Sequence, residues 1–203
     1  PLTIPQVCAV LGVNSNMAFR FLATMVTAGY LTKDGRTGGY LLSLKTLQLS
    51  RKAMTNLEIR RIAPPFMELL SKQFPQANIN LGVLYEGEVL MLDRIDSQTL
   101  PRTYFTPGKT VPFHATAMGK VLTCELSEDE IDRMVAVKGL KGYTSKTITD
   151  VSVLKKELTK VKRQNYALDR EEQIIHDNCN SAPIRDASGK IIAGIMDYLF
   201  FSV

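Results

Sequence analysis

Helical spacing of apolar residues, interrupted by glycine, restricts the first 43 residues to a small set of folds. Val7, Val10 and Leu11 have the spacing of one helix face, which predicts a helix. Thr3 precedes them as a candidate N-cap, and Gly12 suits the left-handed residue that ends many helices. The pattern therefore indicates a short helix that stops at a glycine turn.

A second helix and a hairpin are expected directly after this turn. The polar residues 14–16 can cap the second helix, residues 30–32 and 40–42 are predicted as short strands, and residues 34–39 are rich in turn formers. Two helices followed by a hairpin with basic Arg36 at its tip are typical of a winged helix-turn-helix. The alternative is a helical hairpin followed by a purely structural β-hairpin.

Basic residues are concentrated at the N-terminal end of the chain. Residues 1–56 hold six lysines and arginines against one acid, Asp34, whereas residues 57–203 hold 19 bases and 19 acids. The net charge of +5 therefore lies entirely in the first quarter. A compact positive charge is expected of a phosphate-binding module, and it favours DNA binding over the structural alternative.

Composition excludes several classes of protein. The chain has 203 residues and is 45% hydrophobic and 22% charged, which predicts a folded globular protein. It contains no run of about 18 apolar residues and no secretion signal, so no membrane partner is expected. Cys8, Cys124 and Cys179 lack metal-ligand spacing and suit a reducing cytoplasm, and His114 and His176 are too few for a multi-histidine metal site. We therefore expect a cytoplasmic protein without metal or cofactor.

The pattern changes after residue 43. Leu44, Leu47 and Leu49 predict an amphipathic linker helix within residues 44–60. Residues 61–203 alternate between short strands and helices, which predicts an α+β domain with a mainly antiparallel sheet flanked by helices. The expected strands are residues 79–84, 89–95, 102–105, 166–168, 182–185 and 191–195, and the expected helices are residues 66–74, 115–123, one from 127 onward, and 154–164.

Seven motifs in a fixed order identify a family. The most specific is P-x-H-A-T-A-x-G-K at residues 112–120. The others are residues 11–22, 28–31, 93–95, 147–149, 166–172 and 182–189. With this ordered set the chain resembles the IclR family of bacterial transcriptional regulators along nearly its whole length.

The resemblance implies a domain plan and a function. Residues 1–43 would form a winged helix-turn-helix whose first helix is absent from this chain, residues 44–60 a linker helix, and residues 61–203 a GAF-like effector domain. The protein would bind a palindromic operator in double-stranded DNA as a homodimer or a dimer of dimers. It would act as a repressor modulated by a small-molecule metabolite, and not as an enzyme. The alternative is a ligand-sensing module without effective DNA binding.

The resemblance places DNA contacts at the start of the second helix and at the hairpin tip. Residues at the start of a recognition helix meet base edges, so Asn16 could read adenine and Arg20 could read guanine or hold a phosphate. For Phe19 the alternative is partial burial against the first helix. The candidate DNA-binding residues are Ser15, Asn16, Met17, Phe19, Arg20 and Arg36.

The resemblance also places a small anionic or polar effector in the C-terminal domain. Backbone amides at a helix start suit a carboxylate. Asp169 would accept ligand hydroxyls, or alternatively would brace Thr147 or a backbone amide, while Glu171 and Glu172 are expected to face solvent or to act as hinge residues. The candidate effector-binding residues are Ala117, Met118, Asp169, Cys179, Met196 and Tyr198.

One departure from the family concerns the last strand. Met196-Asp197-Tyr198 stand where the family typically has Ser-x-Ser. A thioether and a phenol in place of two hydroxyls make the pocket more apolar and fill it. This departure favours an aromatic or bulkier effector, or a pocket that no longer binds the keto acids of the family.

A catalytic alternative is also open. Cys179 could act as a nucleophile with His114 or His176 as its base, which requires the base within hydrogen-bond reach. Only the co-occurrence of these residue types supports it, because no motif spacing connects them.

Overall fold

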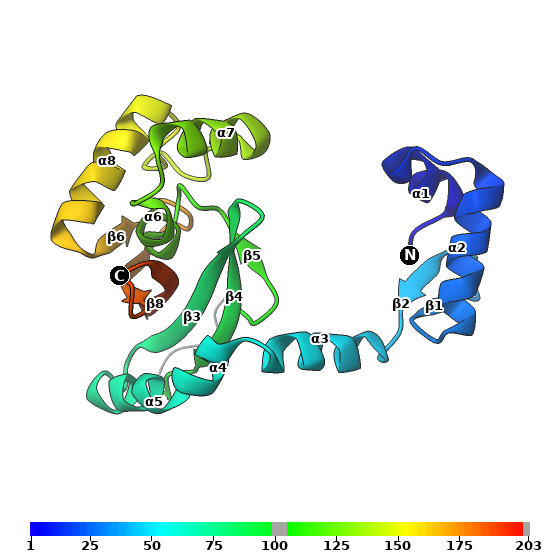
Figure 1. The fold of residues 1–203 in the computed structure, drawn as a ribbon, viewed down its shortest axis with the longest axis horizontal. Helices are drawn as coiled ribbons and strands as arrows, with labels where there is room; N and C mark the ends of the chain where they lie inside the picture. Colours follow the sequence, from blue (N-terminus) through cyan, green and yellow to red (C-terminus); the bar gives the residue numbers. More distant parts are fainter. Residues whose placement is uncertain (99–104, 201–203) are drawn as a thin grey trace. The chain divides into compact units, whose positions relative to one another are not determined.

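A computed structural model describes residues 1–98 and 105–200 of the chain (Figure 1). It divides the chain into two compact units, Pro1–Glu58 and Ile59–Val203. The boundary between the units falls within the segment 44–60 that the sequence predicts as a linker.

The first unit begins with the predicted capped helix. Helix α1 runs over Ile4–Leu11, and the Gln6 side chain accepts a hydrogen bond of 2.8 Å from the backbone N–H of the N-cap Thr3. Gly12 ends the helix with φ 64°, a left-handed conformation that costs glycine little because it has no Cβ. Both predicted caps of α1 are confirmed.

A second helix and a hairpin complete this unit. Helix α2 runs over Ser15–Thr27, and the Asn14 side chain caps it by accepting from the Met17 N–H at 2.9 Å. The axes of α1 and α2 differ by 109°. Strands β1, Leu31–Lys33, and β2, Tyr40–Leu42, pair antiparallel. The small core consists of Leu22, Leu31 and Tyr40, with Ile4, Val7 and Val26 packed against it.

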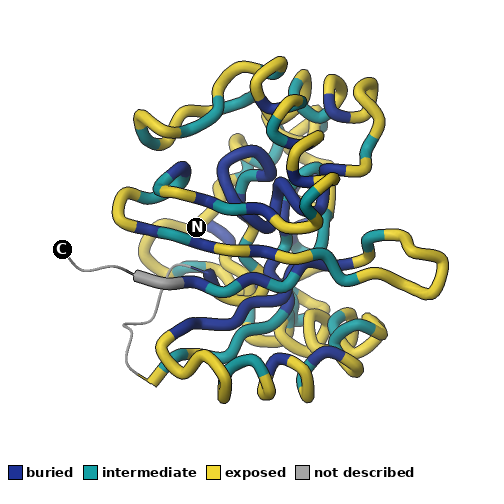
Figure 2. Tube along the Cα trace, turned by 90° about the vertical axis from the view of Figure 1, so that its left-hand side faces the viewer, coloured by how far each residue is buried: buried dark blue, intermediate teal, exposed yellow. Residues whose placement is uncertain are grey.

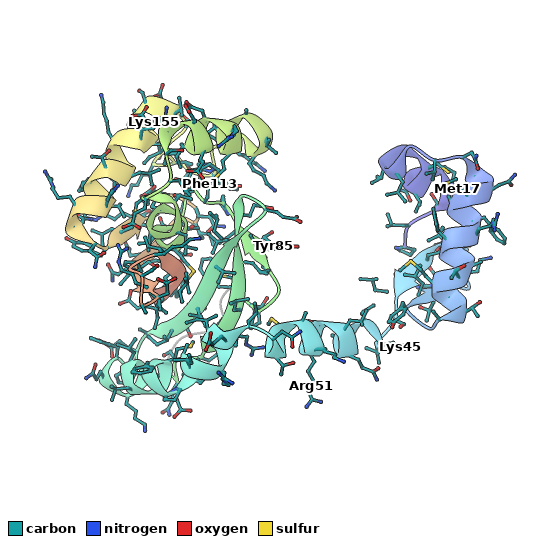
Figure 3. The ribbon with its side chains drawn as sticks, in the orientation of Figure 1. Met17, Lys45, Arg51, Tyr85, Phe113 and Lys155 are labelled. Atoms are coloured by element: carbon teal, nitrogen blue, oxygen red, sulfur yellow. The ribbon has the colours of Figure 1, made fainter. Side chains whose placement is uncertain are left out.

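The predicted linker helix is present and exposed. Helix α3 runs over Thr46–Thr55 and buries none of its residues; the Arg51 side chain is labelled in Figure 3. Lys45 immediately precedes α3, and its Nζ donates to the Ala28 carbonyl at 2.7 Å and lies 4.9 Å from the centre of the Tyr30 ring. Lys45 therefore fastens the start of the linker helix to the C-terminal end of α2.

The second unit contains one six-stranded sheet and its flanking helices. The helices are α4 Glu58–Ile62, which begins at the unit boundary, α5 Pro64–Gln73, α6 Ala117–Thr123, α7 Glu128–Lys138 and α8 Val151–Gln164. The strands are β3 Asn78–Tyr85, β4 Glu88–Ile95, β5 Thr110–Val111, β6 Ala167–Arg170, β7 Asp177–Arg185 and β8 Ile191–Phe200. The strand order is β5-β4-β3-β8-β7-β6, and every described pair is antiparallel.

Helices cover both faces of this sheet (Figure 1). Helix α6 lies against one face with all seven of its residues buried, and α8 and α7 pack outside it. On the other face Arg60 of α4 pairs with Asp93 of β4 at 2.9 Å. Beside α5, a mainly apolar groove of about 300 Å³ contains Leu70, Phe74 and Ile79 in its lining. The most buried stretches follow the central strands and α6 (Figure 2).

Strands β7 and β8 are longer than predicted, and a further expected strand lies largely outside the described residues. Strand β8 continues from the predicted end at residue 195 to Phe200, because it pairs there with the early residues of β3 and β7. Strand β7 begins at Asp177, well before the predicted start at Ala182, because alternate residues of the polar run Asp177-Asn178-Cys179-Asn180-Ser181 are buried in the sheet. The short strand β5 was not predicted. The strand expected at residues 102–105 lies largely outside the described residues.

Candidate functional site

The residues predicted to contact DNA form an exposed surface on α2. Ser15, Asn16, Met17, Phe19 and Arg20 are all exposed, and Met17 is labelled in Figure 3. Phe19 keeps 52% of its surface accessible, so burial against α1 does not account for it. A hollow on this surface is lined by Asn14, Asn16, Met17, Arg20, Phe21 and Thr24.

The hairpin tip presents Arg36 on a structured turn. Asp34 accepts hydrogen bonds from the Arg36 N–H at 3.0 Å and from the Thr37 hydroxyl at 2.7 Å. These bonds, the one from Thr37 most of all, lower the pKa of Asp34. The Asp34 carboxylate is therefore engaged with the turn itself, and the Arg36 side chain is exposed.

The residues predicted to bind an effector come together on the sheet face beneath α6. Strand register places Asp169 opposite Cys179, and Cys179 opposite Tyr198, in one row across β6, β7 and β8. A Cβ at Gly82 or Gly194 would lie 2.5 Å and 2.9 Å from the Met118 side chain, so Met118 lies directly over these glycines. All six predicted residues are at most 3% exposed: Ala117, Met118, Asp169, Cys179, Met196 and Tyr198.

Asp169 is held by a backbone amide. Its Oδ1 accepts from the Glu172 N–H at 2.8 Å, as the backbone-amide alternative predicts, whereas the Thr147 hydroxyl donates to the Glu172 carbonyl instead. Contact of Asp169 with a ligand stays a prediction. Burial is the main reason that the pKa of Asp169 is raised to about 7. The hydrogen bond from the Glu172 N–H and the charge of Lys120 oppose this rise, whereas the nearby Glu172 and Asp177 carboxyls add to it. The Asp169 carboxyl is therefore protonated over part of the neutral range.

This raised pKa makes stability depend on pH. The folded protein keeps a proton on Asp169 up to about pH 7, whereas an unfolded chain releases it near 3.8. The folded state binds more protons between these values, so the free energy of unfolding falls as the pH rises. In the wild type, Asp169 should lower the free energy of unfolding by about 2 kcal/mol between about pH 5 and pH 7. We expect this decrease to be absent from Asp169→Asn.

Urea unfolding at several pH values checks this expectation. The matched control is Asp186→Asn, because Asp186 is exposed and its hydrogen bonds, chiefly from Ser188, lower its pKa instead. The control should keep the wild-type slope over this pH range. A wild-type slope in Asp169→Asn would contradict the assignment.

Asp177 is a site residue that the sequence analysis missed. The Tyr198 hydroxyl donates to Asp177 Oδ1, and the Tyr198 ring meets that of Phe105 edge-on with centroids 5.7 Å apart. Burial raises the pKa of both Asp177 and Tyr198. Asp177 lies two residues before Cys179 in β7, so the two-residue period of a strand could have placed both on one face.

A buried ion pair between Lys120 and Glu172 was also missed. Lys120 is 1% exposed, and its Nζ lies 2.6 Å from Glu172 Oε1. The prediction that Glu172 faces solvent is wrong. The Thr144 and Thr147 hydroxyls donate to the carbonyls of Glu171 and Glu172 at 2.7 Å and 2.6 Å, and these bonds hold the backbone that carries Glu172.

The surroundings of Cys179 do not suit a nucleophile. Burial raises the pKa of its thiol, and the nearby carboxyls of Asp169, Asp177 and Asp197 raise it further. His114 Nε2 instead lies 3.0 Å from the Lys141 carbonyl oxygen. The thiol is therefore kept protonated, in the form that does not attack.

Residues 1–98 and 105–200 contain neither a group of metal-ligating side chains nor a single membrane-spanning helix. No three histidine, cysteine, aspartate or glutamate side chains there are grouped so as to hold a metal ion. Within the same ranges no single helix has the length and hydropathy needed to cross a membrane; α1 and α2 meet the criterion only as a pair bent by 109°.

Fold and site together define a class of two-part protein, in which a small unit of two helices and a β-hairpin is joined to an α+β unit with a row of buried polar residues. The family model described as "Bacterial transcriptional regulator IclR C-terminal" matches residues 51–196. The chain therefore belongs to the IclR family of transcriptional regulators.

Named relatives agree with this assignment. The chain is 34% identical to the HTH-type transcriptional regulator KdgR of Escherichia coli over 182 residues, which are 90% of this chain and 69% of that protein. It is 27% identical to the HTH-type transcriptional repressor AllR of Salmonella typhi over 177 residues, 87% of this chain and 65% of that protein. The chain thus spans about two thirds of the length of these relatives, which are named as regulators and not as enzymes.

A solved structure extends the comparison to the second unit. The inducer-binding domain of the PobR transcription factor from Acinetobacter, a double mutant in complex with 3-hydroxybenzoic acid, is 28% identical to this chain with a TM-score of 0.65. The match covers 69% of this chain and 82% of that domain.

Proposed function

We propose that this chain is a DNA-binding repressor whose operator affinity is modulated by a small molecule bound in its second unit. Residues 1–43 would read a palindromic operator, residues 44–60 would form the linker, and residues 61–203 would bind the effector. The protein would act as a homodimer or a dimer of dimers in the cytoplasm. The repressor assignment is supported by the name of the relative AllR.

The observation that carries the DNA-binding proposal is the exposed start of α2. Its polar and basic side chains, including Asn16 and Arg20, are accessible, and they lie on the unit that holds the excess positive charge. Exposed Arg36 at the hairpin tip supplies a second basic contact, suited to a phosphate or the minor groove.

The effector proposal is supported by the row of buried residues beneath α6. Asp169, Cys179 and Tyr198 are adjacent across three strands, and Met118 of α6 lies over the same sheet. The related PobR domain binds an aromatic acid. A small organic acid or an aromatic compound is the class of effector we propose here.

The proposed coupling between the two sites runs through the linker helix. Lys45 fastens the start of α3 to the helix-turn-helix unit, and α4 is joined to the sheet by the Arg60–Asp93 pair. An effector that binds one arrangement of the linker helices more tightly would favour that arrangement. It would thereby change the spacing of the two DNA-binding units in a dimer.

Fluorescence anisotropy of the naturally started protein tests this proposal. The probe is the DNA upstream of its own gene, titrated at two salt concentrations with random DNA as the control. Tight binding that exceeds the control and weakens steeply with salt supports the regulator. Equal, weak binding to both DNAs would instead favour a sensor without effective DNA binding.

Arg20→Ala provides a residue-level prediction. We expect this change to weaken operator binding by about 1–3 kcal/mol, with relaxed preference at one base position if Arg20 contacts guanine. A shallower salt dependence with unchanged base preference would indicate a phosphate contact. Anisotropy titrations on operator variants measure both quantities.

The matched control is Arg163→Ala, which removes the same charge from an exposed position on α8 in the other unit. It should leave operator affinity within a few tenths of a kcal/mol, as expected of an uninvolved surface position. Equal losses in the two variants would remove the support for α2 as the DNA-reading helix.

A further inference from the structure

The proposed effector site already contains a phenol, which is the side chain of Tyr198. This residue is 3% exposed, its hydroxyl donates a hydrogen bond to Asp177 Oδ1, and its ring packs edge-on against Phe105 at a centroid distance of 5.7 Å. A hydrogen-bond acceptor for the hydroxyl and an aromatic wall for the ring are the two features that a phenol needs from a binding site. The chain therefore has a complete phenol site that its own side chain occupies.

The buried cations around this site are already paired. Lys120 Nζ lies 2.6 Å from Glu172 Oε1. Arg94 forms an ion pair with Asp96, and its NH1 donates to the Phe105 carbonyl at 2.8 Å. A ligand carboxylate would have to displace one of these carboxylates to gain a cationic partner.

The acidic residues near Tyr198 also disfavour binding of a ligand carboxylate. Asp169 and Asp177, both at most 3% exposed, form no ion pair in the part of the chain that the structure describes. Helix α6 has only seven residues, and its Gly119 N–H is already bonded to the Thr116 hydroxyl at 3.1 Å. A ligand carboxylate beside Asp169 and Asp177 would therefore gain no cationic anchor, and it would meet like charge wherever these carboxyls are ionised.

Neutral polar groups would find partners beside Tyr198. Asn78 and Asn80 are fully buried, and register places them opposite Tyr198 and Met196 on the same sheet face. Asn78 Nδ2 and Asn80 Oδ1 have no hydrogen-bond partner within the described ranges. An unpaired buried donor and acceptor are costly, and a bound polar molecule would satisfy them.

We infer that this site takes an uncharged phenol, which displaces the Tyr198 side chain, and that it rejects aromatic carboxylates. The inference narrows the proposed effector class to its uncharged aromatic members, and it rests on the proposed function for its regulatory meaning. Tyr198 is then the specificity-determining residue, because its ring competes with the ligand for both Asp177 and Phe105. An effector succeeds only when it binds these partners better than the tethered ring does.

Calorimetric titration of the full chain with phenol and with 3-hydroxybenzoate tests the inference. Tyr198→Ala should bind phenol at least about tenfold more tightly than the wild type, since excising a buried ring leaves a cavity able to take up an aromatic molecule. In this variant 3-hydroxybenzoate should bind at least about tenfold more weakly than phenol, because of the two carboxyls. The further change Asp177→Asn should recover part of the hydroxybenzoate binding.

Tyr85→Ala is the matched control, since Tyr85 is 53% exposed on the β3–β4 hairpin and is labelled in Figure 3. It should keep the wild-type phenol affinity. Equal phenol affinities of the wild type and Tyr198→Ala, or tighter binding of the hydroxybenzoate, would overturn the inference. If Tyr198→Ala does not fold alone, added phenol should restore cooperative unfolding, and its failure to do so counts equally against the inference.

These titrations do not depend on DNA binding. A chain that fails to bind its operator but gains phenol affinity on Tyr198→Ala would contradict the proposed function and leave the site assignment intact. A chain that binds its operator but gains no phenol affinity would do the reverse.

Discussion

Lys120→Met is expected to lower the free energy of unfolding by about 4 kcal/mol, because it leaves a buried carboxylate without its partner. Glu172 is 9% exposed, and Lys120 Nζ is its ion-pair partner at 2.6 Å. Its other oxygen, Oε2, has no hydrogen-bond partner among the described residues. Removing the ammonium would also remove the nearby charge that favours ionised Asp169, so Glu172 and Asp169 would repel each other whenever both are ionised.

Urea unfolding followed by near-ultraviolet circular dichroism measures this loss. The matched control is Lys155→Met; Lys155 is labelled in Figure 3. Lys155 pairs with Glu128 and Asp132 on the surface, where solvent screening leaves an ion pair little effect on stability. If Lys120→Met lowers the free energy of unfolding no more than this control does, an unpaired Glu172 carboxylate does not carry the desolvation cost that its burial implies.

A second variant separates the charge from the packing. Adding Glu172→Gln to Lys120→Met removes the unpaired charge, and we expect the double variant to recover a large part of the stability. No recovery would mean that the Lys120 side chain acts through its packing in α6 and not through its charge.

The first unit shows how far local patterns reach. Thr3, Gly12 and Asn14 cap the helices as their residue types predict, because a cap depends on a few neighbouring residues. The hairpin with Arg36 at its tip is equally local. The exposure of the α2 candidates follows from helix periodicity, whereas their contact with DNA stays a prediction.

The second unit shows where local patterns stop. The polar stretch that opens β7 has low strand propensity, and only the neighbours β6 and β8 make it a strand. The pairing of Lys120 with Glu172 spans 52 positions and depends on α6 packing against the sheet, which no local spacing encodes. The available signal was a lysine inside an otherwise apolar helix, which is unusual because a buried lysine requires a partner.

Family motifs supplied what spacing could not. The resemblance placed Ala117, Met118, Asp169 and Cys179 in one site, and the structure brings them to one sheet face. It did not indicate Asp177, because the partner of Asp177 is Tyr198, the residue at which this chain departs from the family.

Gly119→Ala is expected to cost at least about 3 kcal/mol, because the added methyl group would overpack a rigid part of the core. A Cβ at this position would lie 2.2 Å from the Phe113 carbonyl oxygen and 2.4 Å from its Cα. Both are backbone atoms of a residue that is 1% exposed, so no side-chain rotation can relieve the clash. Helix α6 would have to move away from the preceding segment.

This displacement would reach the effector site, since Met118 and Lys120 are the neighbours of Gly119 in α6. The matched control is Gly142→Ala, whose Cβ would meet only Thr149 Cγ2 at 3.5 Å, an ordinary contact. It should change stability by no more than about 0.5 kcal/mol. Urea unfolding compares the two variants, and a Gly119→Ala protein within about 1 kcal/mol of the wild type would show that α6 can shift cheaply. In that case α6 could move when a ligand binds. The expected loss of stability would instead mean that α6 keeps its position, so that only the ligand and the Tyr198 side chain rearrange.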